Sequence, residues 1–255
     1  MEKRHQTNLE NPKSDFIFGT RAVMEAVEAG KELDRVLLQK GQRNELTQEL
    51  TSLLKSHGIP FNTVPPEKLN RVTRKNHQGV IAFLSAVTYA SLDHIISQAY
   101  AEARDPLLLL LDRVTDVRNF GAIARSAECL GADALVIPTQ GSARISGDAV
   151  KASAGALLHI PVCREDYLKR TMSYLRSNGI RIIACTEKAE KLLSEADLKG
   201  PIALLLGSEE DGISPNYLSF ADEEVRIPMK GQIASLNVSV AASLCLYEVM
   251  RQREL

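Results

Sequence analysis

Short aliphatic runs alternate with segments of helical periodicity through the last two-thirds of the chain. Two runs, 107–111 and 202–206, are aliphatic at every position. Continuous aliphatic strands between helices are typical of a parallel sheet covered on both faces. The pattern predicts strands at 107–111, 134–137, 162, 180–185, 202–206 and 225–227, and helices at 120–130, 147–157, 167–177, 215–220 and 235–253. We therefore predict an α/β fold built on a parallel sheet.

The first third of the chain predicts a smaller α/β unit. Strands are expected at 35–39, 61–64 and 80–84, and helices at 20–29, 44–57 and 67–72. Residues 91–103 carry apolar side chains at helical spacing and are predicted to form a connecting helix. The expected organisation is a disordered tail (1–15), an N-terminal domain (16–88), a linker or connecting helix (89–105) and a larger C-terminal domain (106–255).

The composition is that of a globular protein with a substantial core. The 255 residues include 44% hydrophobic and 25% charged side chains. No secretory signal is expected from the polar residues at the start of the sequence, and no apolar run approaches the ~18 residues that a membrane span needs. The four cysteines are far apart and form no C-x-x-C pair, so they are predicted to be small buried hydrophobes. We expect a cytoplasmic protein that binds no metal.

Positive charge is slightly enriched at the N-terminal end of the chain. Residues 1–88 contain 13 Lys and Arg against 10 Asp and Glu, although the net charge of the whole chain is −1. Arg71, Arg74 and Lys75 form the densest basic cluster, with His77 close by. These side chains are candidates for contacts with RNA phosphates, and a solvated basic loop is an equally weighted alternative.

Polar residues follow three of the predicted strands. The three blocks are residues 112–125, residues 207–212 and residues 227–238. In open α/β sheets, ligands bind in the crevice beyond the carboxyl ends of the strands. The three blocks are therefore predicted to form one composite site, although each block alone is compatible with an ordinary loop.

The second block indicates the kind of ligand. Gly207 and Gly212 have the spacing of a phosphate-binding loop, but the Lys-Ser/Thr that completes such a loop is missing. Glu209, Glu210 and Asp211 lie between the glycines and would repel a polyphosphate. A cationic ligand, such as the sulfonium and ammonium groups of S-adenosylmethionine, is favoured over ATP or a dinucleotide. The alternative is a solvated acidic turn.

Together the blocks resemble the SpoU/TrmH family of RNA ribose 2'-O-methyltransferases, in the SPOUT superfamily. The third block matches the family pattern without a gap as far as Ala241, and the first block keeps Asn119, Gly121 and Arg125. The chain departs from the pattern at residues 117–118, often Pro-His in relatives, and at Glu210, which replaces a glycine. If that glycine has a positive φ, Glu210 would be strained.

A looser resemblance covers the N-terminal domain, through residues 18–23 and 77–79. This pairing is most similar to the subgroup that methylates a guanosine of large-subunit ribosomal RNA. The resemblance implies a C-terminal trefoil knot, a homodimer formed through the C-terminal domain, and S-adenosylmethionine as cofactor. Ribosomal RNA is the expected partner, and transfer RNA is less favoured because many tRNA enzymes of the family lack such an N-terminal domain.

The resemblance also assigns candidate site residues. The candidates for catalysis are Arg125, Asn119, Glu209, Ser235 and Asn237, and those for cofactor binding are Gly207, Ile227 and Leu236, with Thr186 and Met229 as weaker matches. Because a guanidinium is a poor general base, we expect Arg125 to clamp an RNA phosphate and stabilise the developing alkoxide. Ser235 could instead, or in addition, be the N-cap of the last helix.

Two alternatives to a ribosomal RNA methyltransferase remain open. One is a tRNA 2'-O-methyltransferase, and the other is a noncatalytic RNA-binding factor of ribosome assembly. The intact set of candidate catalytic residues counts against the second alternative.

Overall fold

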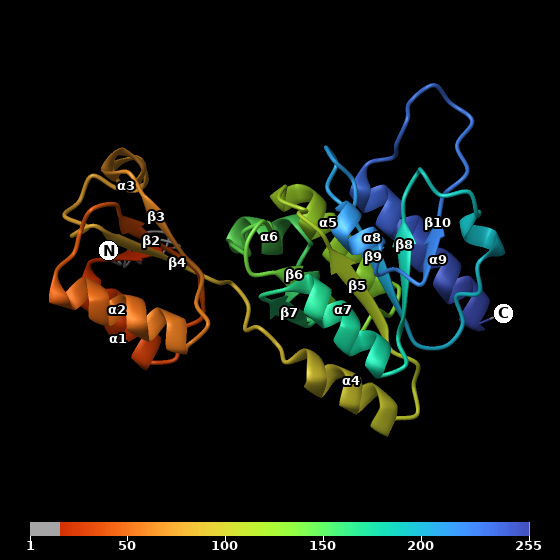
Figure 1. Ribbon diagram of the computed structural model, residues 1–255, viewed down its shortest axis with the longest axis horizontal. Helices are drawn as coiled ribbons and strands as arrows, with labels where there is room; N and C mark the ends of the chain where they lie inside the picture. Colours follow the sequence, from red (N-terminus) through yellow and green to blue (C-terminus); the bar gives the residue numbers. More distant parts are fainter. Residues whose placement is uncertain (1–15, 255) are drawn as a thin grey trace, which may run out of the picture. The chain divides into compact units, whose positions relative to one another are not determined.

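The computed structural model describes residues 16–254 in two compact units, one ending at Ser85 and the other beginning at Ala86 (Figure 1). Residues 1–15, for which a disordered tail is predicted, lie outside the described residues. Within residues 16–254, no helix has the length and apolar character needed to span a membrane.

The first unit is a four-stranded mixed sheet with helices packed against it. The strand order is β1-β4-β2-β3, in which β2 and β3 are parallel and the other pairs antiparallel. The elements are β1 (Phe16–Phe18), α1 (Thr20–Glu28), β2 (Leu33–Gln39), α2 (Glu45–Ser56), β3 (Phe61–Val64), α3 (Pro66–Val72) and β4 (Val80–Leu84). Leu50 and Leu54 of α2 pack with Val23 of α1 and Val36 of β2 in a buried core.

The second unit is built on a six-stranded sheet in which every strand pair is parallel, as predicted. The order is β10-β8-β9-β5-β6-β7. The strands are β5 (Leu107–Leu111), β6 (Ala134–Pro138), β7 (Val162–Glu165), β8 (Arg181–Cys185), β9 (Ile202–Leu206) and β10 (Glu223–Val225). The helices are α4 (Leu92–Ala101), α5 (Val117–Cys129), α6 (Gly147–Ala152), α7 (Leu168–Ser177), α8 (Pro215–Leu218) and α9 (Val238–Glu254), with 3-10 turns at Ala156–Leu158 and Leu193–Glu195.

Both faces of this sheet are buried, because successive side chains of a strand point to opposite faces. Leu109 of β5 packs in a cluster with residues of α5 and α9, including Phe120 and Leu246. Leu108, its neighbour in β5, packs in a second cluster with Ile96 of α4 and Met172 of α7. The sheet is thus covered on both sides, and α4 belongs to this unit.

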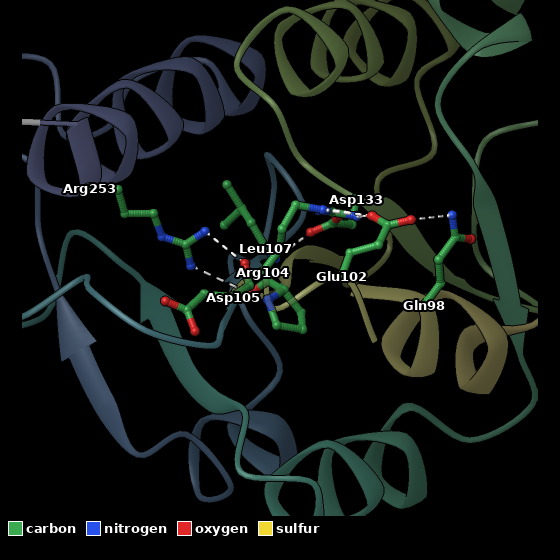
Figure 2. A network of polar contacts seen from close by, with 8 residues as sticks. Gln98, Glu102, Arg104, Asp105, Leu107, Asp133 and Arg253 are labelled. Atoms are coloured by element: carbon green, nitrogen blue, oxygen red, sulfur yellow. Dashed lines mark hydrogen bonds and ion pairs between the residues drawn. The ribbon is translucent and has the colours of Figure 1, made fainter. Parts of the chain in front are cut away.

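Arg253 attaches the end of α9 to the start of the central strand (Figure 2). Its guanidinium donates to the carbonyl oxygens of Asp105 (3.0 Å) and Gly200 (2.5 Å), and burial lowers the pKa of Arg253. Beside it, Arg104 pairs with Asp133 (2.6 Å), whose other carboxylate oxygen accepts from the Leu107 backbone N–H (2.8 Å). These contacts fix the amino end of β5. The residues that follow the strand lie at its opposite, carboxyl end.

Several element boundaries differ from the prediction. The predicted helix at 147–157 ends at Ala152, because Ala154 and Gly155 have positive φ angles (51° and 89°) that a right-handed helix cannot contain. The short edge strand β1 was not predicted, since its pairing with β4 is a contact distant in sequence. Strand β10 ends at Val225 and does not extend to residue 227, because its pairing with β8 covers only Glu223–Val225.

The cysteines are only partly as predicted. Cys163 and Cys245 are buried and Cys185 is half-buried, but Cys129 is exposed near the end of α5. Burial raises the pKa of the Cys163 thiol to about 12, so this thiol stays protonated near neutral pH.

The knot implied by the resemblance stays a prediction.

Candidate active site

The acidic loop (residues 207–212) is a tight turn closed by its own backbone. Ser208 N–H donates to the Gly212 carbonyl (3.1 Å), and Gly212 N–H donates to the Ser208 carbonyl (3.0 Å). A Cβ at Gly207 would lie 2.0 Å from the Gly212 carbonyl carbon, so this position requires glycine. The strain considered for Glu210 does not arise, because Glu210 is not among the residues with a positive φ.

Arg113, the second residue after β5, holds the acidic loop in place. It donates from Nη1 to Asp211 (2.9 Å) and from Nη2 to the Gly212 carbonyl (3.2 Å). Its Nε donates to Asp112 (3.1 Å), and this hydrogen bond raises the pKa of Arg113. Asp112 is buried and also accepts from the Ser214 backbone N–H (2.7 Å). Asp112 and Arg113 were not among the predicted site residues, although charged residues directly after a buried strand were the signal that could have identified them.

Asn119, Glu209 and Asn237 form a polar cluster that joins the three sequence blocks. Asn119 lies in the first turn of α5, where its backbone N–H donates to the N-cap Asp116 (2.8 Å). Its Nδ2 donates to Oε1 of Glu209, in the acidic loop. The Nδ2 of Asn237 donates to the same Oε1 (2.7 Å) and to Oδ1 of Asn119 (3.1 Å). The structure therefore brings together side chains separated by up to 118 residues.

Asn237 also caps helix α9. Its Oδ1 accepts from the backbone N–H (2.9 Å) and the hydroxyl (2.6 Å) of Ser239, at the second position of the helix. The suggestion that Ser235 caps this helix is therefore wrong, because the helix begins at Val238. Ser235 instead lies in the exposed loop before the helix, on the wall of a cavity.

The acidic loop separates two cavities. The first, about 210 Å³, is lined by Ser235 and by the five predicted cofactor residues Gly207, Ile227, Leu236, Thr186 and Met229. The second, about 230 Å³, lies on the α5 side and is lined by Asp116 and Asn119. Residues 208–211 and Val238 line both. Glu209 therefore stands between the two spaces.

The charge around the first cavity is negative, although Asp211 is paired with Arg113. Its wall includes four carboxylates, Glu187, Glu209, Glu210 and Asp211, and one ammonium group, Lys188. Such a wall suits a ligand that carries positive charge and disfavours one that carries several phosphates. Within residues 16–254, no cluster of three or more His, Cys, Asp or Glu side chains could hold a metal ion.

Arg125 is not brought into the polar cluster. It lies in α5 beyond Asn119, is exposed, and lines neither of the two cavities. Arg118 precedes it by seven residues, which places both exposed guanidinium groups on the same face of the helix. Gly121, between them, packs closely on α6, since a Cβ there would lie 2.5 Å from the Cβ of Ala152.

The predicted RNA-binding residues lie in the first unit. Arg71 is in the last turn of α3, and Arg74 and Lys75 follow that helix. All three side chains are exposed.

Comparison with known proteins identifies both units. The model of the SpoU rRNA Methylase family matches residues 106–247, and that of "RNA 2'-O ribose methyltransferase substrate binding" matches residues 16–90. A putative TrmH family tRNA/rRNA methyltransferase of Bacillus subtilis, YacO, is 34% identical over 94% of this chain and 96% of its own.

Two solved structures are similar to this chain in fold. The SpoU methyltransferase AviRb from Streptomyces viridochromogenes, in complex with the cofactor AdoMet, is 27% identical, with a TM-score of 0.59 over 93% of this chain and 89% of its own. The TrmH/SpoU tRNA modifying enzyme of A. aeolicus is 28% identical, with a TM-score of 0.55 over 63% of this chain and 85% of its own.

Proposed function

Because the chain belongs to the SpoU/TrmH family of RNA methyltransferases, we propose that it transfers the methyl group of S-adenosylmethionine to a ribose 2'-hydroxyl of ribosomal RNA. By resemblance, the acceptor is a guanosine of the large-subunit RNA. The observation that carries the proposal is the Asn119–Glu209–Asn237 cluster, which stands between two cavities of a kind that a two-substrate reaction needs.

The first cavity is the proposed cofactor site. When bound, S-adenosylmethionine supplies a methyl group activated by the neighbouring sulfonium. Gly207, Thr186 and Ile227, at or beyond the carboxyl ends of neighbouring strands, would hold the cofactor with Met229 and Leu236. The four carboxylates of the wall favour the positive charges of the sulfonium and ammonium groups.

The second cavity is the proposed site of the acceptor ribose. Methyl transfer requires the 2'-hydroxyl oxygen to be positioned in line with the methyl group and to lose its proton. Oε1 of Glu209 already accepts from Asn119 and Asn237, and within residues 16–254 its Oε2 has no hydrogen-bond partner. Oε2 is therefore the oxygen available to hold the hydroxyl and accept its proton. Ser235, across the acidic loop, would add a hydrogen bond from the cofactor side.

Arg125 is proposed to clamp a phosphate of the RNA beside the acceptor nucleotide. The exposed guanidinium has no hydrogen-bond or ion-pair partner within residues 16–254, so its donors are available to an RNA phosphate. The Arg125 guanidinium can stabilise the developing alkoxide only if the bound RNA places the 2'-oxygen near the guanidinium. Arg71, Arg74 and Lys75 of the first unit are proposed as further phosphate contacts.

A homodimer through the C-terminal unit is part of the proposal. Val240, Leu244 and Tyr247 follow one another at helical spacing along α9 and are 47%, 41% and 52% exposed. An apolar stripe of this kind on a well-formed helix is typical of a protein–protein interface. A second copy of the chain would cover the stripe by a two-fold contact of α9 with α9.

Transfer RNA is the main alternative substrate. The A. aeolicus tRNA modifying enzyme matches only 63% of this chain, whereas the substrate-binding family model matches residues 16–90 as well. An additional substrate-binding unit supports a larger RNA substrate. The intact polar cluster between the two cavities counts against a noncatalytic RNA-binding factor.

Methyl-transfer assays with purified RNAs test the proposal. The protein and tritiated S-adenosylmethionine are incubated with ribosomal RNA or with tRNA, and the modified nucleotide is mapped by primer extension. We expect label in large-subunit ribosomal RNA at a ribose, with calorimetric binding of S-adenosylhomocysteine and none of ATP or NAD. Label in tRNA alone would favour the alternative substrate, and absence of both transfer and S-adenosylhomocysteine binding would overturn the proposal.

A further inference from the structure

The first unit contains a preformed open cavity of about 500 Å³ that is separate from the polar cluster. It lies between residues 39–42, which begin at the last residue of β2, and residues 76–79, which precede β4. The Gln39 N–H donates to the Gly79 carbonyl (2.8 Å), and the Gln42 side chain donates to the Gln78 carbonyl (3.1 Å). These hydrogen bonds join the two segments, so the cavity does not need to assemble when a ligand arrives.

Close packing fixes the backbone on one side of this cavity. Gln78 and Gly79 have φ angles of 51° and 76°, and a Cβ at residue 79 would lie 1.8 Å from Oε1 of Gln42. Within the same turn, Nδ1 of His77 accepts from the Gly79 N–H (3.0 Å), so in the neutral ring Nε2 carries the proton and donates to Asn70 (3.0 Å). Both ring nitrogens are therefore used to shape the turn, and the ring edge is not available to a ligand.

Side-chain amides dominate the wall of the cavity. They belong to Gln39, Gln42, Asn76 and Gln78. Within residues 16–254, the amide groups of Gln39, Asn76 and Gln78 have no hydrogen-bond partner. Each amide presents a donor and an acceptor side by side, which matches the paired donors and acceptors at the edge of a nucleobase.

The charge around the cavity has one sign. Residues 39–43 and 73–79 contain four Lys and Arg (Lys40, Arg43, Arg74 and Lys75) and no Asp or Glu. Lys40 is in the wall itself. Arg74 and Lys75 immediately precede the wall segment at residues 76–79. A neutral amide surface beside cations is suited to a ligand that has both a polar heterocycle and a phosphate.

We propose that this cavity binds one unpaired nucleotide of the RNA substrate, with the amides of Gln39 and Asn76 reading the base edge and Lys40 contacting the phosphate. Proteins read RNA sequence mainly in loops and bulges, where a base is free to leave the stack. The inference rests on the proposed function, because that function supplies RNA as the ligand. It assigns to the first unit the selection of sequence, separate from the chemistry of the second unit.

Fluorescence anisotropy with four short labelled homopolymeric RNAs (A, C, G and U) tests the inference on the full chain. The Gln39→Ala/Asn76→Ala double variant is expected to bind the preferred homopolymer about tenfold more weakly and to lose the preference among the four. Lys40→Ala is expected to weaken all four alike and to reduce the slope of affinity against salt by about 0.7. The matched control is Gln48→Ala, an exposed amide of α2 outside the cavity, which should bind as the original protein does.

Three results of the anisotropy experiment would overturn the inference: no RNA binding by the original protein, unchanged binding by the double variant, or an equal loss for all four RNAs. The inference would also be overturned if an acidic polypeptide displaced the RNA from the original protein and bound the double variant more weakly. Thermal unfolding followed by circular dichroism verifies that each variant is folded, and calorimetry with S-adenosylhomocysteine verifies that the first cavity of the second unit is unaltered.

Methyl transfer separates this inference from the proposed function. If the original protein methylates ribosomal RNA and the double variant does so with unchanged kcat/KM, the nucleotide site is refuted while the function stands. If the original protein methylates no RNA but binds it with amide-dependent preference, the function is refuted while the nucleotide site stands.

Discussion

Asn237 has two separable roles, and substituting it distinguishes the polar cluster from simple helix capping. Its Oδ1 accepts from Ser239 at the start of α9, whereas its Nδ2 donates to Glu209 (2.7 Å) and to Asn119 (3.1 Å). Asn237→Ala removes both roles. Asn237→Ser keeps an oxygen that can cap the helix but is too short to reproduce the amide contacts with Glu209.

The two substitutions should differ in stability and agree in activity. Loss of an N-cap typically costs ~1 kcal/mol, which corresponds to a fall in Tm of about 2–4 °C for a chain of this size. We expect that fall for Asn237→Ala and a much smaller one for Asn237→Ser. Both should reduce methyl transfer about 100-fold, or ~2.7 kcal/mol of barrier, because Glu209 loses the donor that orients its carboxylate.

Single-turnover methyl transfer with saturating S-adenosylmethionine measures the barrier, and thermal unfolding measures the stability. Calorimetry with S-adenosylhomocysteine checks that the cofactor cavity is intact, and Asn216→Ala, an exposed asparagine in α8, is the matched control. If Asn237→Ser has near-normal turnover while Asn237→Ala is unstable, Asn237 is only a cap and the proposed catalytic role of the cluster is wrong.

Three further predictions follow from the site. Arg125→Ala should lose about 100- to 1,000-fold in single-turnover rate with unchanged S-adenosylhomocysteine affinity, and Arg125→Lys should recover little; near-normal turnover would refute the phosphate clamp. Gly207→Ala should weaken S-adenosylhomocysteine binding about tenfold or more, because a Cβ would lie 2.0 Å from the Gly212 carbonyl carbon. The control Gly147→Ala, which has open space around the added Cβ, should bind normally. Equal affinities of the two variants in calorimetry would contradict the packing argument. Leu244→Glu should convert a dimer to a monomer in sedimentation velocity, and an unchanged dimer would show that α9 is not the interface.

Most strands of the second unit could be predicted because local composition leaves little choice. The runs at Leu107–Leu111 and Ile202–Leu206 are aliphatic throughout, and their length of five residues favours a strand buried on both faces over a buried helix. The polar residues that follow these strands were expected to meet, because the carboxyl ends of parallel strands lie at one edge of a sheet.

Positions that depend on a distant partner could not be predicted. Strand β10 ends at Val225 because its pairing with β8 stops there, and α9 begins at Val238 because Asn237, not Ser235, caps it. Serine and asparagine are both favoured N-cap residues, and the sequence pattern had suggested only Ser235 as the cap. The choice depends on Glu209 and Asn119, which hold the Asn237 amide from other parts of the chain.

The sequence by itself determined the fold class and, through three short motifs, the family and the general location of the site. Tertiary structure alone decided which motif residues touch: it placed Glu209 between Asn119 and Asn237, left Arg125 outside that cluster, and fixed the acidic loop through Arg113 and Asp112. The physical reason is that strand and helix patterns arise from neighbours along the chain. Hydrogen bonds across nearly 100 residues, such as that of Arg113 with Asp211, depend on how the folded elements are placed in space.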